Sequence, residues 1–238
     1  MTLSTADARD RWLRATTAER AELGPRAVAT CAEALGILAD RLAERSYPVA
    51  EPLIPCSHLD DDLRQFADAG VTVPPALEAL WRVAGNVCFV DLDRYRHVEF
   101  WRAVAGDGMP VPCCDGIVID APAQGGWTDY ILDMLEDMGD DEPGPAIEIA
   151  PDDLHKDNVS GSGPYEILLP APGDDPWLAV LDGFRWGAVR PPSAPPDPPD
   201  LVSYLRTAVL ECGGFPGLFG DPRYASILAE LVVDLPPF

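Results

Sequence analysis

Residues 201–218, LVSYLRTAVLECGGFPGL, constrain the fold most, because a helical pattern ends there at a fixed stop. Asp200 is a suitable N-cap, and the two glycines after the helix can supply the left-handed backbone that ends it. Phe215 would then enter the core, so we expect the end of this helix to be buried. The apolar positions on one side of the helix are Leu201, Leu205, Ala208, Val209 and Cys212.

Helices are expected near both ends of the chain, and strands mainly between them. The expected helices cover residues 5–45, 59–66, 75–84, 128–138, 200–212 and 222–233. The expected strands cover residues 87–90, 117–119, 146–149, 166–169 and 178–181, whereas 95–105 fits either class. Thr128 and Asp221 are the expected N-caps of the helices that they precede. This order of elements predicts the α+β class.

The first helical region is expected to consist of two helices separated at Gly24-Pro25, with Pro25 near the start of the second. The second helix carries apolar residues at spacings of three and four. They are Val28, Cys31, Leu35, Leu38 and Leu42. This stripe covers about two heptads, fewer than the three or four that indicate a coiled coil. We therefore expect it to pack within the chain.

The chain is strongly acidic, with 40 Asp and Glu residues against 17 Lys and Arg residues and a net charge of −23. Direct binding to nucleic acid or to an anionic membrane is disfavoured, because both require positive charge. Negative charge instead favours attraction to basic proteins, and many toxins that act on nucleic acids have basic surfaces. The competing interpretation is that the acidic residues only keep the protein soluble.

The six cysteines show neither the spacing of a zinc site nor that of a CxxC redox pair. Cys31, Cys88 and Cys212 occupy apolar positions and are expected in the core. The first residues lack the apolar core of a signal peptide. No run approaches the roughly 18 apolar residues of a membrane span. These features predict a cytoplasmic protein with reduced thiols and no metal site.

An acidic segment is the strongest candidate for binding another protein. Seven carboxylates fall within residues 129–142, and two aromatic residues lie beside them. Aromatic anchors surrounded by charge of one sign are common in interfaces. The predicted partner-binding residues are Trp127, Asp129, Tyr130, Asp133, Glu136 and Asp137. A solvated helix face is the competing interpretation, and a calcium loop is disfavoured because the EF-hand spacing is missing.

Residues 152–158 hold His155 and Lys156 among carboxylates, which a hydrolase or a metal site can use. Residues adjacent in sequence do not generally face each other, however, and the HExxH spacing is missing. We therefore expect a structural turn and no catalytic residues. The competing hypothesis is an enzyme, and it predicts turnover that His155→Ala abolishes. His58 and His97 are isolated, and we expect solvated or locally paired histidines.

Segments 147–170 and 201–218 are similar to the signature of the SUKH superfamily, and so is the helix after Pro75 that turns into a strand at Gly85-Asn86. This family consists chiefly of bacterial immunity proteins, which bind and neutralise a cognate toxin, together with fungal cell-wall regulators. The resemblance implies an α+β fold with a curved mixed or antiparallel sheet flanked by helices. It also implies a protein partner, no catalytic residues and no required cofactor.

The resemblance implies a SUKH-like domain at residues 71–238, and residues 1–70 are then an N-terminal helical extension packed on it. The proline-rich segment 190–199, expected to be a stiff extended connector, departs from the family pattern. The expected function is that of a non-enzymatic immunity protein that covers the active site of a basic toxin such as a nuclease or deaminase. A regulatory or scaffold module of the same fold is the alternative. The sequence indicates neither the partner's identity nor the oligomeric state.

Overall fold

The computed structural model describes residues 4–91, 94, 96–106, 116–122, 127–137, 145–150, 165–184, 186 and 189–238. Helices and two antiparallel three-stranded sheets within these residues confirm the α+β class. The α-helices are α1 (Thr5–Arg14), α2 (Thr17–Glu44), α3 (Leu59–Asp68), α4 (Pro75–Val83), α5 (Arg96–Ala105), α6 (Trp127–Asp137), α7 (Leu201–Leu210) and α8 (Ala225–Val232). The strands are β1 (Leu53–Ile54), β2 (Asn86–Cys88), β3 (Val118–Ile119), β4 (Ala146–Ala150), β5 (Tyr165–Leu168) and β6 (Leu181–Asp182).

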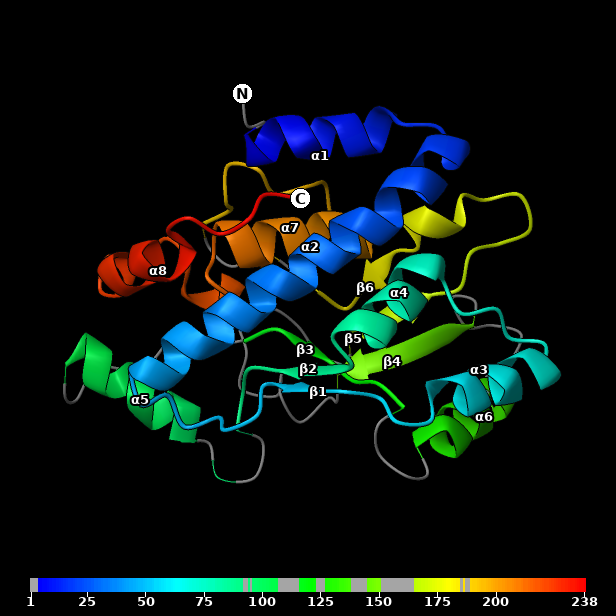
Figure 1. Ribbon diagram of the computed structural model, residues 1–238, viewed down its shortest axis with the longest axis horizontal. Helices are drawn as coiled ribbons and strands as arrows, with labels where there is room; N and C mark the ends of the chain where they lie inside the picture. The colour runs from blue at the N-terminus through cyan, green and yellow to red at the C-terminus, as the bar shows by residue number, and fades with distance from the viewer. Residues whose placement is uncertain are drawn as a thin grey trace.

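The long helix α2 crosses the molecule, and α4, α7 and α8 pack against it (Figure 1). The strands lie below it in the orders β1-β2-β3 and β4-β5-β6, and all neighbours are antiparallel. The main-chain N–H of Asp120, just after β3, donates to the carbonyl of Ile149 in β4 at 2.7 Å. The two sheets therefore meet at β3 and β4. Among the described helices, none combines the length and the apolar character that a membrane span requires.

The break between the first two helices lies at Thr16, so the expected break at Gly24-Pro25 is wrong. The side chain of Thr16 accepts the N–H of Glu19 at 3.3 Å, and the Glu19 carboxylate accepts the N–H of Thr16 at 2.7 Å. This reciprocal capping box starts α2 at Thr17, eight residues before Pro25. Pro25 is exposed on the outer side of the helix, and buried residues lie on both sides of it: Arg20 and Gly24 before it, and the stripe from Val28 after it.

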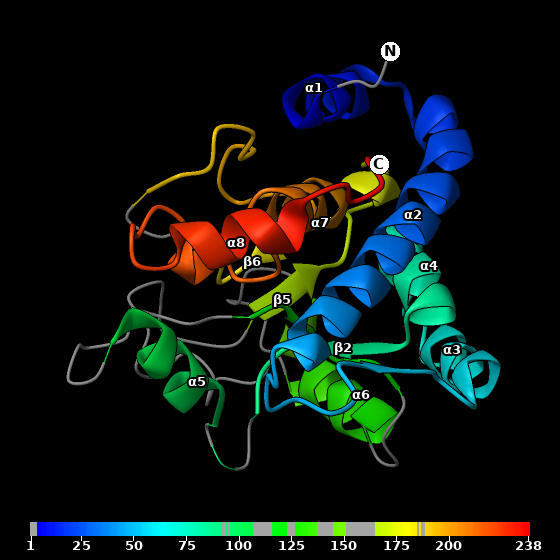
Figure 2. The same ribbon diagram turned by 60° about the vertical axis from the view of Figure 1, so that its left-hand side comes forward.

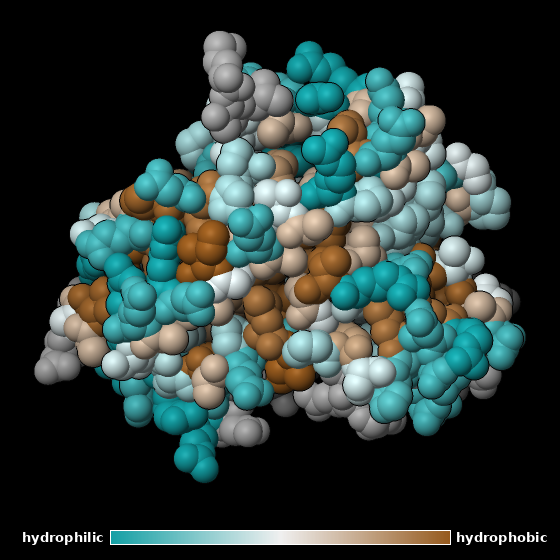
Figure 3. Space-filling view, viewed as in Figure 1, coloured by the Kyte–Doolittle hydropathy of each residue, from teal (hydrophilic) through white to brown (hydrophobic). Residues whose placement is uncertain are grey.

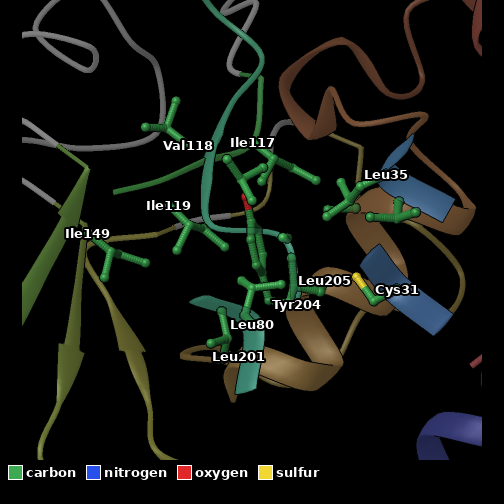
Figure 4. Close-up of a cluster of buried hydrophobic side chains, with 14 of the residues drawn as sticks. Cys31, Leu35, Leu80, Ile117, Val118, Ile119, Ile149, Leu201, Tyr204 and Leu205 are labelled. Atoms are coloured by element: carbon green, nitrogen blue, oxygen red, sulfur yellow. The ribbon is translucent and has the colours of Figure 1, made fainter. Parts of the chain in front are cut away.

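The apolar stripe of α2 is confirmed as the centre of the core. Each of its five residues is at most 2% exposed. Figure 4 shows side chains from α2, α4, α7 and both sheets converging on one cluster. Those labelled are Cys31, Leu35, Leu80, Ile117, Val118, Ile119, Ile149, Leu201, Tyr204 and Leu205. Full burial of such a side chain stabilises the fold by about 1.5–3 kcal/mol, so the stripe joins the helical layer to the strands.

The end of α7 is buried as expected. Gly213 and Gly214 have φ values of 58° and 87°, which is the left-handed conformation that ends a helix with little strain at glycine. The side chain of Phe215 is completely buried, and its ring centroid lies 4.7 Å from Trp101 and 5.5 Å from Tyr47. The glycine turn thus places an aromatic ring between α5 and the loop after α2.

Two polar contacts fix α1 and the start of α2 to distant parts of the chain. The indole N–H of Trp12 donates at 3.0 Å to the carboxylate of Asp200, which also accepts the N–H of Ser203 as the N-cap of α7. The guanidinium of Arg20 forms an ion pair with Asp175 at 2.5 Å, and both side chains are largely buried. Separating a buried pair of this kind costs about 3–5 kcal/mol.

Two expected helix starts are displaced in the structure. Thr128 lies inside α6 and does not cap it, because its hydroxyl donates to the carboxylate of Asp62 in α3 at 2.8 Å. The last helix begins at Ala225 and not at Asp221. The Asp221 carboxylate accepts a main-chain N–H two residues later, which forms a turn before the helix. In both cases a side-chain contact replaces the expected cap.

The remaining differences concern segments with weak periodicity. Residues 95–105, which fit either class, form α5, and the expected strand 178–181 is divided between the 3₁₀ turn η2 (Pro176–Leu178) and β6. The segment 190–199 contains turns and does not extend stiffly. Its Ser193 is buried, with Oγ 3.2 Å from Oγ1 of Thr207 in α7. Packing against α7 therefore overrides the extended preference of the prolines.

The approach of Gly24 to Trp177 gives a stability prediction. A Cβ at Gly24 would lie 2.2 Å from Cζ3 of the Trp177 ring, whereas a Cβ at Gly36 meets nothing within 4 Å. Gly24→Ala should displace the buried indole and lower the free energy of unfolding by about 1–3 kcal/mol. The matched change Gly36→Ala should raise it by about 0.5–1 kcal/mol through helix propensity. Urea unfolding followed by circular dichroism measures both, and equal effects of the two changes would contradict the contact.

Candidate functional site

The acidic helix α6 is held against α3 and β4 by one of its sides. Ile131 is 1% exposed and Thr128 is buried, and the Thr128 hydroxyl bonds to Asp62 of α3. Residues one and two positions after Thr128 point away from this side, because successive helix residues are about 100° apart. Asp129 and Asp133 are accordingly exposed, one turn from each other.

Three predicted partner-binding residues lie together on this outer side: Asp129, Tyr130 and Asp133. Tyr130 is 50% exposed, and its hydroxyl donates to the carboxylate of Glu148 in β4 at 3.2 Å. Burial and the charge of Glu148 raise the pKa of the Tyr130 phenol, which therefore remains a hydrogen-bond donor. The aromatic ring is thus held in one position at the surface. The side chains of Trp127, Glu136 and Asp137 lie outside the described part of the structure.

The carboxylates of Asp129 and Asp133 are not neutralised by neighbours. Within the residues that the structure describes, neither has a cationic group at ion-pair distance. Carboxylates directed outward beside an aromatic ring can accept hydrogen bonds from the arginine and lysine side chains of another protein. The outer side of α6 is therefore suited to bind a basic surface.

The structure places a second acidic helix, α3, beside α6. The sequence alone did not assign α3 to this surface. Figure 3 shows hydrophilic side chains gathered where α3 lies, next to α6. Asp60 pairs with Arg82 at 2.8 Å, and Asp61 pairs with Arg64. These pairs compensate part of the negative charge of α3. The carboxylates of α6 are therefore more available to a partner than those of α3. The run of three aspartates at the start of α3 was the available signal, but only the fold places it beside α6.

The other candidate groups are titratable side chains that lie outside α6. Among the described residues, no set of three His, Cys, Asp or Glu side chains is arranged to hold a metal ion. His97 is buried, and its Nδ1 accepts the N–H of Asp91 at 3.1 Å, which confirms a local pairing. Burial raises the pKa of the Cys31 and Cys212 thiols, which therefore remain protonated. His155 and Lys156 lie outside the described residues.

A partly buried carboxyl, that of Asp120, has a raised pKa. Asp120 follows β3, and its main-chain carbonyl accepts the indole N–H of Trp81 at 2.9 Å. Burial of its side chain raises the pKa of Asp120 to about 6. Asp120 lies at the junction of the two sheets, so its ionisation affects the fold and not the outer side of α6.

Comparison with protein-family models, with curated proteins and with solved structures finds no match to this chain.

Asp120 makes the stability of the protein depend on pH. Its folded-state pKa is about 6, against 3.8 without burial. Between these values the folded chain binds more protons, so this residue lowers the free energy of unfolding as the pH rises from about 4 to 6. Asp120→Asn removes the ionisation and should stabilise the protein at pH 7.5 by up to about 3 kcal/mol.

The same variant should differ little from the parent chain at about pH 3, where Asp120 is largely protonated in both states. Urea unfolding at the two pH values measures the difference between variant and parent, which isolates this residue from other titrating groups. An equal difference at both pH values would show that Asp120 is not the cause.

Proposed function

We propose that this chain is a non-enzymatic immunity protein of the SUKH type, which binds a cognate toxin and covers its active site. The observation that carries the proposal is the outer side of α6. There a half-exposed aromatic ring, Tyr130, lies beside Asp129 and Asp133, whose carboxylates have no cationic partner among the described residues. We call these three residues the α6 face.

The charge of the whole chain supports a basic partner. A net charge of −23 attracts a cationic protein over distances longer than the contacts themselves. Such attraction accelerates association and orients the partner, while the close contacts determine how slowly it dissociates. The free carboxylates of Asp129 and Asp133 supply close contacts for arginine or lysine, and the ring of Tyr130 supplies an apolar anchor.

The rigidity of the α6 face supports tight binding. The hydrogen bond from Tyr130 to Glu148 restricts the ring before any partner arrives. The contact between Thr128 and Asp62 and the burial of Ile131 hold the helix in place. A face that is already ordered loses less conformational entropy on binding, so more of the contact energy appears as affinity.

The proposed mechanism is exclusion of the substrate. An enzyme that acts on nucleic acid binds the phosphate backbone through basic side chains. The carboxylates of Asp129 and Asp133 would occupy the positions of those phosphates, and the bulk of the protein would block access. The antiparallel pair β4-β5 and the α7 helix that ends before Phe215 coincide with the SUKH-like segments and support this assignment.

The α6 face is tested by reversing its charge. Asp129→Lys combined with Asp133→Lys should weaken binding to the proposed cationic toxin by about 100-fold or more, because close interfacial charge pairs contribute more than a tenfold change each. The matched control reverses Glu33 and Asp40, which are exposed on α2. This control has the same net charge and should slow association only modestly. Titration calorimetry at two salt concentrations measures both.

Equal loss of affinity in the two double variants would mean that net charge acts without a specific face. Unchanged affinity in both would remove the α6 face from the proposal.

The amount of protein needed distinguishes binding from catalysis: an immunity protein abolishes toxin activity at one equivalent, whereas an enzyme acts at far less. Substoichiometric protection lost in His155→Ala would favour the enzyme. A partner without toxic activity would favour the regulatory module.

A further inference from the structure

A pocket of about 210 Å³ lies where α1, α2, α7 and the last residue of the sequence meet. Figures 1 and 2 both show the C-terminal end between α1 and α7, on the opposite side of the strands from α6. The α6 face and the pocket are therefore separate parts of the surface. The residues of the pocket wall that matter here are Arg11, Trp12, Arg26, Arg206 and Phe238.

The charge around this pocket is opposite to that of the protein as a whole. Three of the 17 basic residues line it, in a chain with 40 acidic ones. Arg11 and Arg26 are exposed, and neither forms an ion pair with any carboxylate in the described part of the chain. These two guanidinium groups therefore keep their charge available at the mouth of the pocket.

The inner end of the pocket holds a buried cation that is incompletely bonded. Arg206 is only 3% exposed, and its Nη1 is buried with no hydrogen-bond partner among the residues that the structure describes. Its Nε donates to the carbonyl of Phe238, and its guanidinium lies 5.6 Å from the Phe238 ring centroid. The nearby carboxylate of Asp200 compensates part of the charge of Arg206, while its Oδ1 accepts the indole N–H of Trp12 and the N–H of Ser203.

A buried guanidinium nitrogen without a hydrogen bond is costly, so an anion placed beside Arg206 would be stabilised. Burial also lowers the pKa of Arg206 to about 10, which leaves it charged at neutral pH. Guanidinium groups bind carboxylates in a two-pronged geometry that a point charge does not match. The arginines therefore indicate a carboxylate ligand.

The remaining wall of the pocket is apolar and indicates the body of that ligand. The ring of Trp12 is almost completely buried, and Leu23, Ala27 and Phe238 complete the wall. A cavity of about 150 Å³ accepts benzene, so this pocket has room for a single ring with a short acidic side chain.

We propose that this pocket binds a small amphipathic carboxylic acid, with an aromatic or branched aliphatic body against Trp12 and a carboxylate held by Arg11, Arg26 and Arg206. The ligand would connect α1 to α2 and α7, since each helix supplies one of these arginines. This site is independent of the proposed toxin binding.

The experiment titrates the full chain with phenylacetate and, as the neutral control, phenylacetamide. Binding is followed by NMR through the indole N–H signal of Trp12, which Trp12→Phe identifies by its loss. Phenylacetate should bind at one site with a Kd of about 1 mM or tighter and the amide at least about tenfold more weakly. Higher salt should weaken the binding of phenylacetate.

Variants locate the site without disturbing the buried Arg206. Arg11→Gln combined with Arg26→Gln should weaken phenylacetate binding by about tenfold or more. The control Arg102→Gln changes an exposed arginine on α5, far from the pocket, and should leave the affinity unchanged. No saturable binding of phenylacetate, equal binding of the acid and the amide, or equal loss in the control would overturn the proposal.

Discussion

Burial of one side of α2 is the contact on which the rest of the molecule depends. Val28, Cys31, Leu35, Leu38 and Leu42 pack beneath the helix, and both α4 and α7 contact it. Each of these helices is in turn attached to a sheet, since β2 follows α4 and the bridge between residues 180 and 200 joins the start of α7 to the start of β6. Loss of the stripe would therefore separate the helices and the strands together, and the fold should behave cooperatively.

Local sequence patterns predicted the helices whose position depends on apolar spacing and on capping residues. Spacing of apolar residues identified α2, α4 and α7, and Asp200 and the glycines after α7 marked its two ends correctly. Gly24-Pro25 suggested a helix break that the structure does not contain. The capping box at Thr16 and the buried stripe of α2 outweigh the low helix propensity of these two residues. Strands of two to five residues carry too little periodicity to predict two sheets.

The two candidate sites differ in how far the sequence alone predicts them. Helical spacing alone places Asp129 and Asp133 on one side of α6, and the structure confirms their exposure. The nearness of α3 depends on a contact between Thr128 and Asp62, which are 66 positions apart, and no local rule predicts it. The pocket lined by Arg11, Arg26 and Arg206 is even harder to predict from the sequence, since its residues come from both ends of the chain. The division into residues 1–70 and 71–238 remains a prediction.

The carboxylate of Asp200 has a consequence for how the protein moves. It accepts the N–H of Ser203 in the first turn of α7 and also the indole N–H of Trp12 in α1. One side chain therefore begins one helix and anchors another that lies 188 positions away. Detachment of α1 leaves a buried carboxylate short of a donor, and fraying of α7 removes the acceptor that positions Trp12. The two helices should open as a single unit, so α1 should be as protected from local unfolding as α7.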